Sequence, residues 1–314
     1  MYVSIPSRGL TAAYVCLNPL TPPTFASSSP SSSLPPPPDG ELDLSKPILV
    51  FLHAPTCSSA SFSRQFADPR LRAAANLVGV DARLHGRTEA GKWEGKGGGG
   101  YTIDDSAECV MAVLDHLGFS YFVYGEGVLG CRTASWLAIR RPDKVRGLML
   151  ASPAYPIEDP EICASLEQLG QFLTLNKGPG GSGECPAEAL EASYMFGSDP
   201  RQKDRKAEFK EAFERRYGAG FPASDTLTLS SYGRRKAIPA DLLAQIKCPV
   251  VVLSGGGDKI VSPKEACEQW QKSFVNAKGG AKLFEIASAP TLLSWSDYNI
   301  VNRMLASFVQ QSAA

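Results

Sequence analysis

Residues 121–153 read YFVYGEGVLGCRTASWLAIRRPDKVRGLMLASP and carry the pattern of a strand, a glycine-rich turn, a helix and a second strand. The apolar run at 121–125 leads into the turn GEGVLG (125–130), and a helical pattern follows the turn. Two motifs of different function fit this spacing. One is the dinucleotide-binding turn G-x-G-x-x-G, and the other is the nucleophile elbow G-x-S-x-G with Gly127 in the place of its serine. The rest of the sequence distinguishes between them.

Apolar runs of the same kind recur along the chain. They have the near-continuous hydrophobic character of strands that are buried on both faces of a parallel sheet. The runs occupy 47–54, 77–82, 121–125, 147–152, 249–255 and 282–288. Helical patterns separate most of them, at 105–118, 130–141, 262–275 and 296–311. The alternation predicts an α/β fold, with a mostly parallel sheet and helices on both faces.

The alternation stops between the fourth and fifth of these runs. Residues 156–245 are mostly helical in pattern, and we expect them to form a lid or cap inserted over the carboxyl edge of the sheet. The core would then consist of residues 1–155 and 246–314. Near the start, residues 2–17 predict a short pair of strands. Residues 19–40 form a Pro/Ser-rich tract that is too poor in apolar side chains to pack, which predicts a disordered or extended loop.

The composition excludes several classes of function. Lys plus Arg equals Asp plus Glu at 32 each, so no net charge attracts nucleic acid or anionic lipid. Eight scattered cysteines without a C-x-x-C pair and three histidines predict no metal site. The sequence contains no signal-peptide profile and no apolar run of roughly 20 residues that could span a bilayer. We therefore expect a cytoplasmic protein with reduced thiols.

The context of the glycine turn disfavours dinucleotide binding. A Rossmann unit normally opens its sheet with such a turn and places an acidic residue about 20 positions later, at the end of the next strand. Here two expected sheet strands and the N-terminal strand pair precede the turn, and the next strand ends in LASP (150–153) without a carboxylate. We expect no cofactor, and dinucleotide binding is the weakest alternative.

The whole chain resembles the α/β-hydrolase superfamily. Six segments carry the resemblance, and they occur in the same order as in that superfamily. They are LVFLHAPTCSSASF (49–62), VGVDARLHGRTEA (78–90), YGEGVLG (124–130), RRPDKVRGLMLASPA (140–154), LLAQIKCPVVVLSGGGDKIVSP (242–263) and SDYNIVNRMLASFV (296–309). The resemblance implies that the insertion at 156–245 is the family's lid.

The resemblance also places the catalytic positions, which follow the chain order nucleophile, acid, histidine. Asp258 stands at the position of the acid. Gly127 stands at the position of the nucleophile, and Thr291 stands at the position of the histidine. The chain has no histidine after His116. The segment His53-Ala54-Pro55 corresponds to the loop that supplies half of the oxyanion hole, and the backbone amide of Val128 would supply the other half.

These replacements remove the chemistry of the family. Glycine has no atom that could attack a carbonyl, and a threonine hydroxyl cannot exchange a proton near pH 7 as imidazole does. Losing either the serine or the histidine of a triad costs on the order of 10⁶ in turnover. Pro55 has no N–H, and one lost oxyanion donor costs roughly 10² to 10³. We expect hydrolysis through an acyl-enzyme to be absent.

Other residues near the turn offer alternatives. Glu126 could act as a general acid or base in a dry pocket. Its plainer interpretation is a loop carboxylate that lies in solvent or near the positive end of the following helix. Cys57 and Cys131 could serve as relocated nucleophiles only with a lowered pKa. The three histidines, His53, His85 and His116, are interpreted as structural.

The leading hypothesis is a non-hydrolytic member of the superfamily that binds a small hydrophobic molecule or a protein partner in the apolar pocket such folds enclose. The second is an enzyme that uses Asp258 or Glu126 for acid/base chemistry without a covalent intermediate. The third is dinucleotide binding. The sequence predicts neither the ligand nor the oligomeric state.

Overall fold

The structure is a computed structural model that describes residues 2–5, 10–17, 42–55, 57–83, 85–86, 88, 102–157, 200–204, 206–208, 235–259 and 261–313. The Pro/Ser-rich tract at 19–40 lies outside these residues, as does most of the expected lid at 156–245. Both therefore stay predictions.

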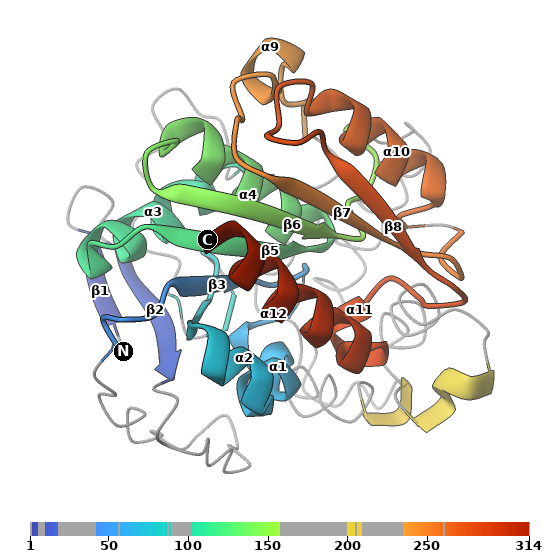
Figure 1. Ribbon diagram of the computed structural model, residues 1–314, viewed down its shortest axis with the longest axis horizontal. Helices are drawn as coiled ribbons and strands as arrows, with labels where there is room; N and C mark the ends of the chain where they lie inside the picture. Colours follow the sequence, from blue (N-terminus) through green and yellow to red (C-terminus); the bar gives the residue numbers. More distant parts are fainter. Residues whose placement is uncertain are drawn as a thin grey trace, which may run out of the picture.

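One sheet organises the described part of the chain, with the strand order β1-β2-β4-β3-β5-β6-β7-β8 (Figure 1). The strands are β1 Tyr2–Ile5, β2 Leu10–Leu17, β3 Ile48–Leu52, β4 Asn76–Val80, β5 Tyr121–Glu126, β6 Val145–Ala151, β7 Val250–Gly255 and β8 Lys282–Ile286. β2 is antiparallel to both of its neighbours, β1 and β4, and the six strands from β3 to β8 are parallel to one another. The N-terminal strand pair and all six predicted strands are confirmed.

Helices cover both faces of this sheet, and Figure 1 shows α12 crossing one of them. The described helical segments are η2 Ser59–Phe62, α1 Ser63–Ala67, α2 Pro69–Ala74, α3 Asp105–Leu117, α4 Gly127–Arg140, η3 Pro200–Gln202, α9 Ala240–Leu243, α10 Lys264–Ser273, α11 Leu293–Ser296 and α12 Tyr298–Ala313. The four longest correspond to the predicted helices. The short segments were not predicted, because one turn of helix has no measurable periodicity.

The alternation of side chains along the strands divides the core in two. In β3, Val50 belongs to the core cluster that includes residues of α3, α4 and α10, whereas Phe51 belongs to the cluster that includes residues of η2, α1 and α12. Every residue of β3, β4, β5 and β7 is buried. Burial on both faces is the reason these strands read as continuous apolar runs.

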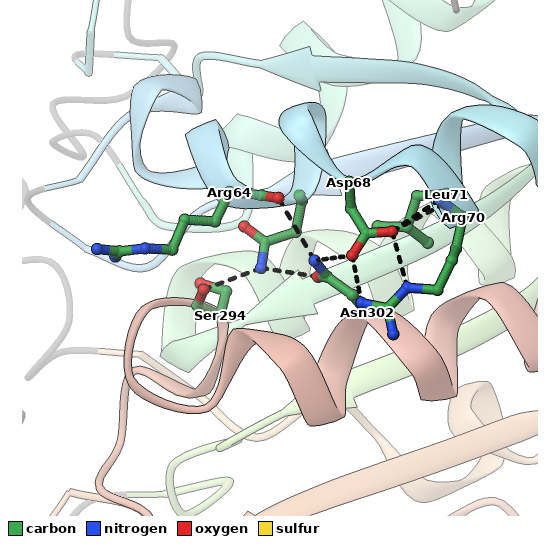
Figure 2. A network of polar contacts seen from close by, with 7 residues as sticks. Arg64, Asp68, Arg70, Leu71, Ser294 and Asn302 are labelled. Carbon is green, nitrogen blue, oxygen red and sulfur yellow. Dashed lines mark hydrogen bonds and ion pairs between the residues drawn. The ribbon is translucent and has the colours of Figure 1, made fainter.

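A buried polar network attaches α12 to α1 and α2 (Figure 2). Gln65 Nε2 donates to the carbonyl oxygen of Ser294 at 2.9 Å and to Asn302 Oδ1 at 3.1 Å. Asn302 Nδ2 donates to Asp68 Oδ2 at 2.9 Å, and Asp68 also caps α2 through the amide of Arg70. Burial opposes ionisation of Asp68, but the hydrogen bonds from Arg70 and Asn302 outweigh it and lower its pKa to about 2.

The glycines of the turn at 125–130 allow three backbone segments to approach closely. A Cβ on Gly125 would stand 2.4 Å from the carbonyl oxygen of Gly130, and a Cβ on Gly130 would stand 2.3 Å from the carbonyl oxygen of Leu52. Gly127 has φ +64° and is the first residue of α4, three positions before the predicted start of the helix. The close packing of α4 against β3 and β5 therefore explains why glycines occur at the G-x-G-x-x-G spacing.

We predict that Gly130→Ala lowers the free energy of unfolding by about 3 kcal/mol or more, because the new methyl group would overlap a backbone carbonyl that cannot rotate away. Urea denaturation measures the change. Gly118→Ala is the matched control, since Gly118 has φ +77° and nothing lies within 4 Å of its Cβ position. It should cost only about 1–2 kcal/mol of backbone strain. Equal effects of the two substitutions would contradict the close approach.

Candidate functional site

The candidate site begins where β3 and β5 end side by side. Leu52 of β3 is the register partner of Gly125 in β5, so the loop after β3 lies against the turn after β5. A Cβ on Gly127 would stand 3.0 Å from Ala54 Cβ and 3.3 Å from Pro55 Cδ. Gly127 therefore faces the loop that the resemblance assigns to the oxyanion hole. Any side chain there would require this loop to shift.

A run of three glycines brings Asp258 to the same edge. The amide of Gly256 donates to the carbonyl of Ile286, and the amide of Gly257 donates to the carbonyl of Ala289, both at 2.9 Å. A Cβ on Gly255 would stand only 2.4 Å from the carbonyl oxygen of Pro290. The loop after β7 thus lies directly against the loop after β8, because no side chains separate their backbones.

Asp258 and Thr291 meet at this junction. Asp258 is 4% exposed and Thr291 is 2% exposed. The hydroxyl group of Thr291 donates to Asp258 Oδ2. The amide of Ser262 donates to the same oxygen, and the amide of Val261 donates to Oδ1, both at 3.0 Å. The carboxylate accepts three hydrogen bonds and holds two loops together.

His53 and His85 are buried, and both contact backbone groups. The amide of Ala82 donates to His53 Nε2 at 3.0 Å, so Nδ1 carries the proton and donates to the carbonyl of Ala54 at 2.8 Å. These two bonds define a neutral tautomer. His85 Nδ1 lies 2.9 Å from the carbonyl of Arg83, and its ring lies 5.0 Å from that of His53. His116 is in the last turn of α3, just before β5 begins at the amino edge of the sheet.

Of the two plainer positions expected for Glu126, the structure excludes solvent and confirms the one near the start of the following helix, because Glu126 is the N-cap residue of α4. Glu126 is 1% exposed, because it is the last residue of β5 and its side chain lies on the same buried face of the sheet as that of Tyr124. Its Oε1 accepts from the amide of Ser294 at 2.8 Å and from the hydroxyl of Tyr124 at 3.1 Å, and its Oε2 accepts from the hydroxyl of Ser294. Burial raises its pKa to about 6, and these hydrogen bonds limit the rise.

The two cysteines proposed as alternative nucleophiles differ in their surroundings. Cys131 is fully buried, and its Sγ donates to the carbonyls of Gly125 at 3.3 Å and Ala151 at 3.4 Å. Burial raises its pKa well above the ordinary value, which disfavours a thiolate. Cys57 is 7% exposed, and its amide donates to the carbonyl of Ala54 at 3.2 Å. Both hydrogen-bond partners of the Cys131 thiol are backbone carbonyls, which cannot act as a base.

Two serines of the site were missed by the sequence analysis. Ser262 lies four residues after Asp258. An aspartate side chain can accept hydrogen bonds from backbone amides three and four residues later, so this spacing is a signal that the sequence offered. Ser294 lies in α11 and gave no signal. Among the described residues, no group of His, Cys, Asp and Glu side chains is arranged to hold a metal ion. In the same residues, every helix is too short or too polar to cross a membrane.

The sequence pattern of the alpha/beta hydrolase fold family matches residues 47–297. This range covers most of the chain, so the chain belongs to that family. A search of curated proteins finds no match to the sequence.

Solved structures of hydrolytic enzymes resemble the fold over nearly its whole length. A hydrolase from Pseudomonas aeruginosa PA01 is similar over 98% of this chain and 97% of its own, with a TM-score of 0.72 and 19% identity. A malate-bound esterase from Thermogutta terrifontis covers 97% of this chain and 95% of its own, with a TM-score of 0.71 and 16% identity. An enol-lactonase from Burkholderia xenovorans LB400 is similar over 99% of this chain and 100% of its own, with a TM-score of 0.70 and 16% identity. At these identities the likeness establishes the fold alone.

We predict that Thr291→Val lowers the free energy of unfolding by about 2 kcal/mol, because it removes a buried hydrogen bond to a carboxylate and keeps the shape of the side chain. Thr102→Val is the matched control, since the Thr102 hydroxyl donates to Asp105 Oδ2 at 2.9 Å on the surface. The control should cost less than about 1 kcal/mol. Thermal and urea unfolding measure both changes. Equal losses in the free energy of unfolding would show that the buried Thr291 contact stabilises the fold no more than the surface contact of Thr102 does.

Proposed function

We propose that this chain is a non-hydrolytic member of the alpha/beta hydrolase fold family that binds a small hydrophobic molecule at the carboxyl edge of its sheet. The observation that carries the proposal is the contact between Thr291 and Asp258. A hydroxyl group that donates to the acid stands where the triad of the family requires an imidazole. The site then lacks a group that could take a proton from a nucleophile and return it to a leaving group.

The turn after β5 supports the same proposal. Gly127 supplies no nucleophilic atom, and Ala54 and Pro55 already crowd the position of its missing Cβ. The strained backbone of an elbow is easily adopted by glycine, since φ +64° costs a residue with a side chain about 1–2 kcal/mol. The elbow geometry is therefore kept without its chemistry.

The same residues indicate the chemical class of the ligand. Pro55 and Val128 are partly exposed apolar residues beside the buried Ala54 and Gly127, and Pro55 has no N–H. Val128 is the second residue of α4, and the first four amides of a helix have no acceptor within it. A ligand with an apolar body and one hydrogen-bond acceptor, such as a ketone or an ester carbonyl, matches this arrangement.

Acid/base catalysis without a covalent intermediate is the second candidate. The pKa of Glu126, about 6, lies near a typical operating pH for such a residue. However, its carboxyl group is buried in the core and is already hydrogen-bonded to Ser294 and Tyr124. Asp258 accepts three hydrogen bonds that already fix its orientation. The geometry therefore favours binding.

The proposal is tested with short-chain p-nitrophenyl esters. The wild-type chain should release nitrophenol without a burst and at the rate of the buffer. The double variant Gly127→Ser, Thr291→His regains the missing residue types and should gain slow hydrolysis, still reduced roughly 10² to 10³-fold by the absent donor at Pro55. A burst in the wild type would refute the proposal, and wild-type turnover lost in Asp258→Asn would establish the second candidate.

Binding is measured separately by titrating a long-chain methyl ketone in a calorimeter. Asp258→Asn should leave its affinity within about twofold of the wild type, because the carboxylate holds loops and does not contact the ligand. Saturable quenching of tryptophan fluorescence by NADH would instead support dinucleotide binding.

A further inference from the structure

Three polar side chains on α4 have buried polar atoms without a hydrogen-bond partner. The atoms are Arg132 Nη1, Thr133 Oγ1 and Trp136 Nε1, and none of them has a partner in the described part of the chain. Arg132 is 1% exposed and Thr133 is 2% exposed. A buried donor that makes no hydrogen bond destabilises the fold, so three such donors on one helix require an explanation.

The three side chains lie on one side of α4. At about 100° per residue, their positions fall within an arc of about 100° around the helix axis. Cys131 and Ala138 occupy the opposite side and belong to the core cluster that contains residues of β3, β5 and β6. The three donors therefore lie on the side of α4 that is turned away from the sheet.

Arg132 connects this side of α4 to two other segments. Its Nε and Nη2 donate to Oδ1 of Asp104, the residue before α3, at 3.1 and 3.0 Å. Nη2 also donates to the carbonyl of Lys236 at 2.8 Å. These bonds fix the guanidinium group, and Nη1 is the nitrogen that keeps no acceptor among the described residues. The direction in which Nη1 can donate is therefore set by the fold.

A second buried guanidinium group lies near Arg132. Burial lowers the pKa of Arg132 most strongly, Asp104 opposes that change, and the charge of Arg235 lowers the pKa further. Arg235 is 8% exposed, and its Nη2 donates to the carbonyl of Tyr155 at 2.8 Å. The side chain of Asp104 is 29% exposed. An anion placed beside Arg132 would offset the repulsion between the two buried arginines.

We propose that this side of α4 is a second binding site, in which Arg132, Thr133 and Trp136 hold the carboxylate group of a small organic acid. A carboxylate accepts hydrogen bonds at about four lone-pair positions, which matches two hydrogens on Nη1, the hydroxyl group of Thr133 and the indole N–H. Hydrogen bonds between guanidinium and carboxylate groups are also among the strongest in proteins. Arg132 lies more than one helical turn beyond Gly127, and this inference does not depend on the function proposed there.

The outer end of this binding site borders solvent. Trp136 is partly exposed, and the exposed Arg140 lies over its indole ring, with Cζ 4.8 Å from the ring centroid. Because the indole N–H itself is buried, entry of an acid requires a shift of the Trp136 ring. Trp136 is therefore the natural reporter of binding.

The test follows the indole N–H signals in the NMR spectrum of the ¹⁵N-labelled full chain during titration with sodium acetate. The signals of Trp136 and Trp270 are assigned with the variants Trp136→Phe and Trp270→Phe. The Trp136 signal should shift and saturate, whereas the Trp270 signal should stay in place, because Trp270 Nε1 already donates to the carbonyl of Ala154 at 2.7 Å. Sodium chloride at the same ionic strength should move neither signal. A Trp136 signal that acetate leaves in place, or that chloride moves equally, would overturn the proposal.

Thr133→Val tests the site without removing a contact of the fold. It should weaken acetate binding about tenfold, because it removes a hydrogen bond to a charged group. It should not lower the midpoint of thermal unfolding, since the hydroxyl group has no partner among the described residues. Ser135→Ala is the matched control on the same helix, because the buried hydroxyl of Ser135 donates to the carbonyl of Cys131 at 2.9 Å. This control should keep acetate affinity within about twofold of the wild type.

Three results of these variants would contradict the proposed site. They are an unchanged acetate affinity in Thr133→Val, an equal loss of affinity in Ser135→Ala, and a lower midpoint of thermal unfolding in Thr133→Val. The last result would show that the hydroxyl group of Thr133 stabilises the fold and is not reserved for a ligand.

Discussion

The close approach of β3, β5 and the start of α4 is the constraint on which the rest of the site depends. A Cβ on Gly130 would stand 2.3 Å from the carbonyl oxygen of Leu52, and a Cβ on Gly125 would stand 2.4 Å from the carbonyl oxygen of Gly130. Without these two glycines, α4 could not begin directly at the end of β5. The position of Gly127 against the loop after β3 follows from this packing. Under the proposed function, this arrangement persists with a glycine at the position that the resemblance assigns to the nucleophile.

The polar contacts of the site show how the fold stabilises two buried carboxyl groups. A buried carboxylate needs donors, because an unpaired one costs several kcal/mol. Asp258 has Thr291 and two backbone amides, and Glu126 has Ser294 and Tyr124. In each case one donor residue, Thr291 for Asp258 and Ser294 for Glu126, comes from the loop and helix after β8.

Much of the fold could be predicted from the sequence, because it depends on local patterns. The parallel strands are buried on both faces and appear as apolar runs, and the long helices show their periodicity. The α11 helix could not be predicted, since its four residues contain no full period. The start of α4 was placed three residues too late, because a glycine at a helix start looks like part of a loop. The site residues Gly127, Asp258 and Thr291 were found only through resemblance to a family.

The order of residues fixes which chemical groups the chain possesses: a glycine in the turn at 125–130, no histidine after His116, and an aspartate after the strand at 249–255. The contacts of those groups depend on the folded arrangement. Thr291 reaches Asp258 across 33 positions of the chain, and Ser294 reaches Glu126 across 168. The burial of Glu126 and the neutral tautomer of His53 are fixed by such partners. No local pattern encodes them, because a hydrogen bond between distant segments exists only after the sheet has brought their ends together.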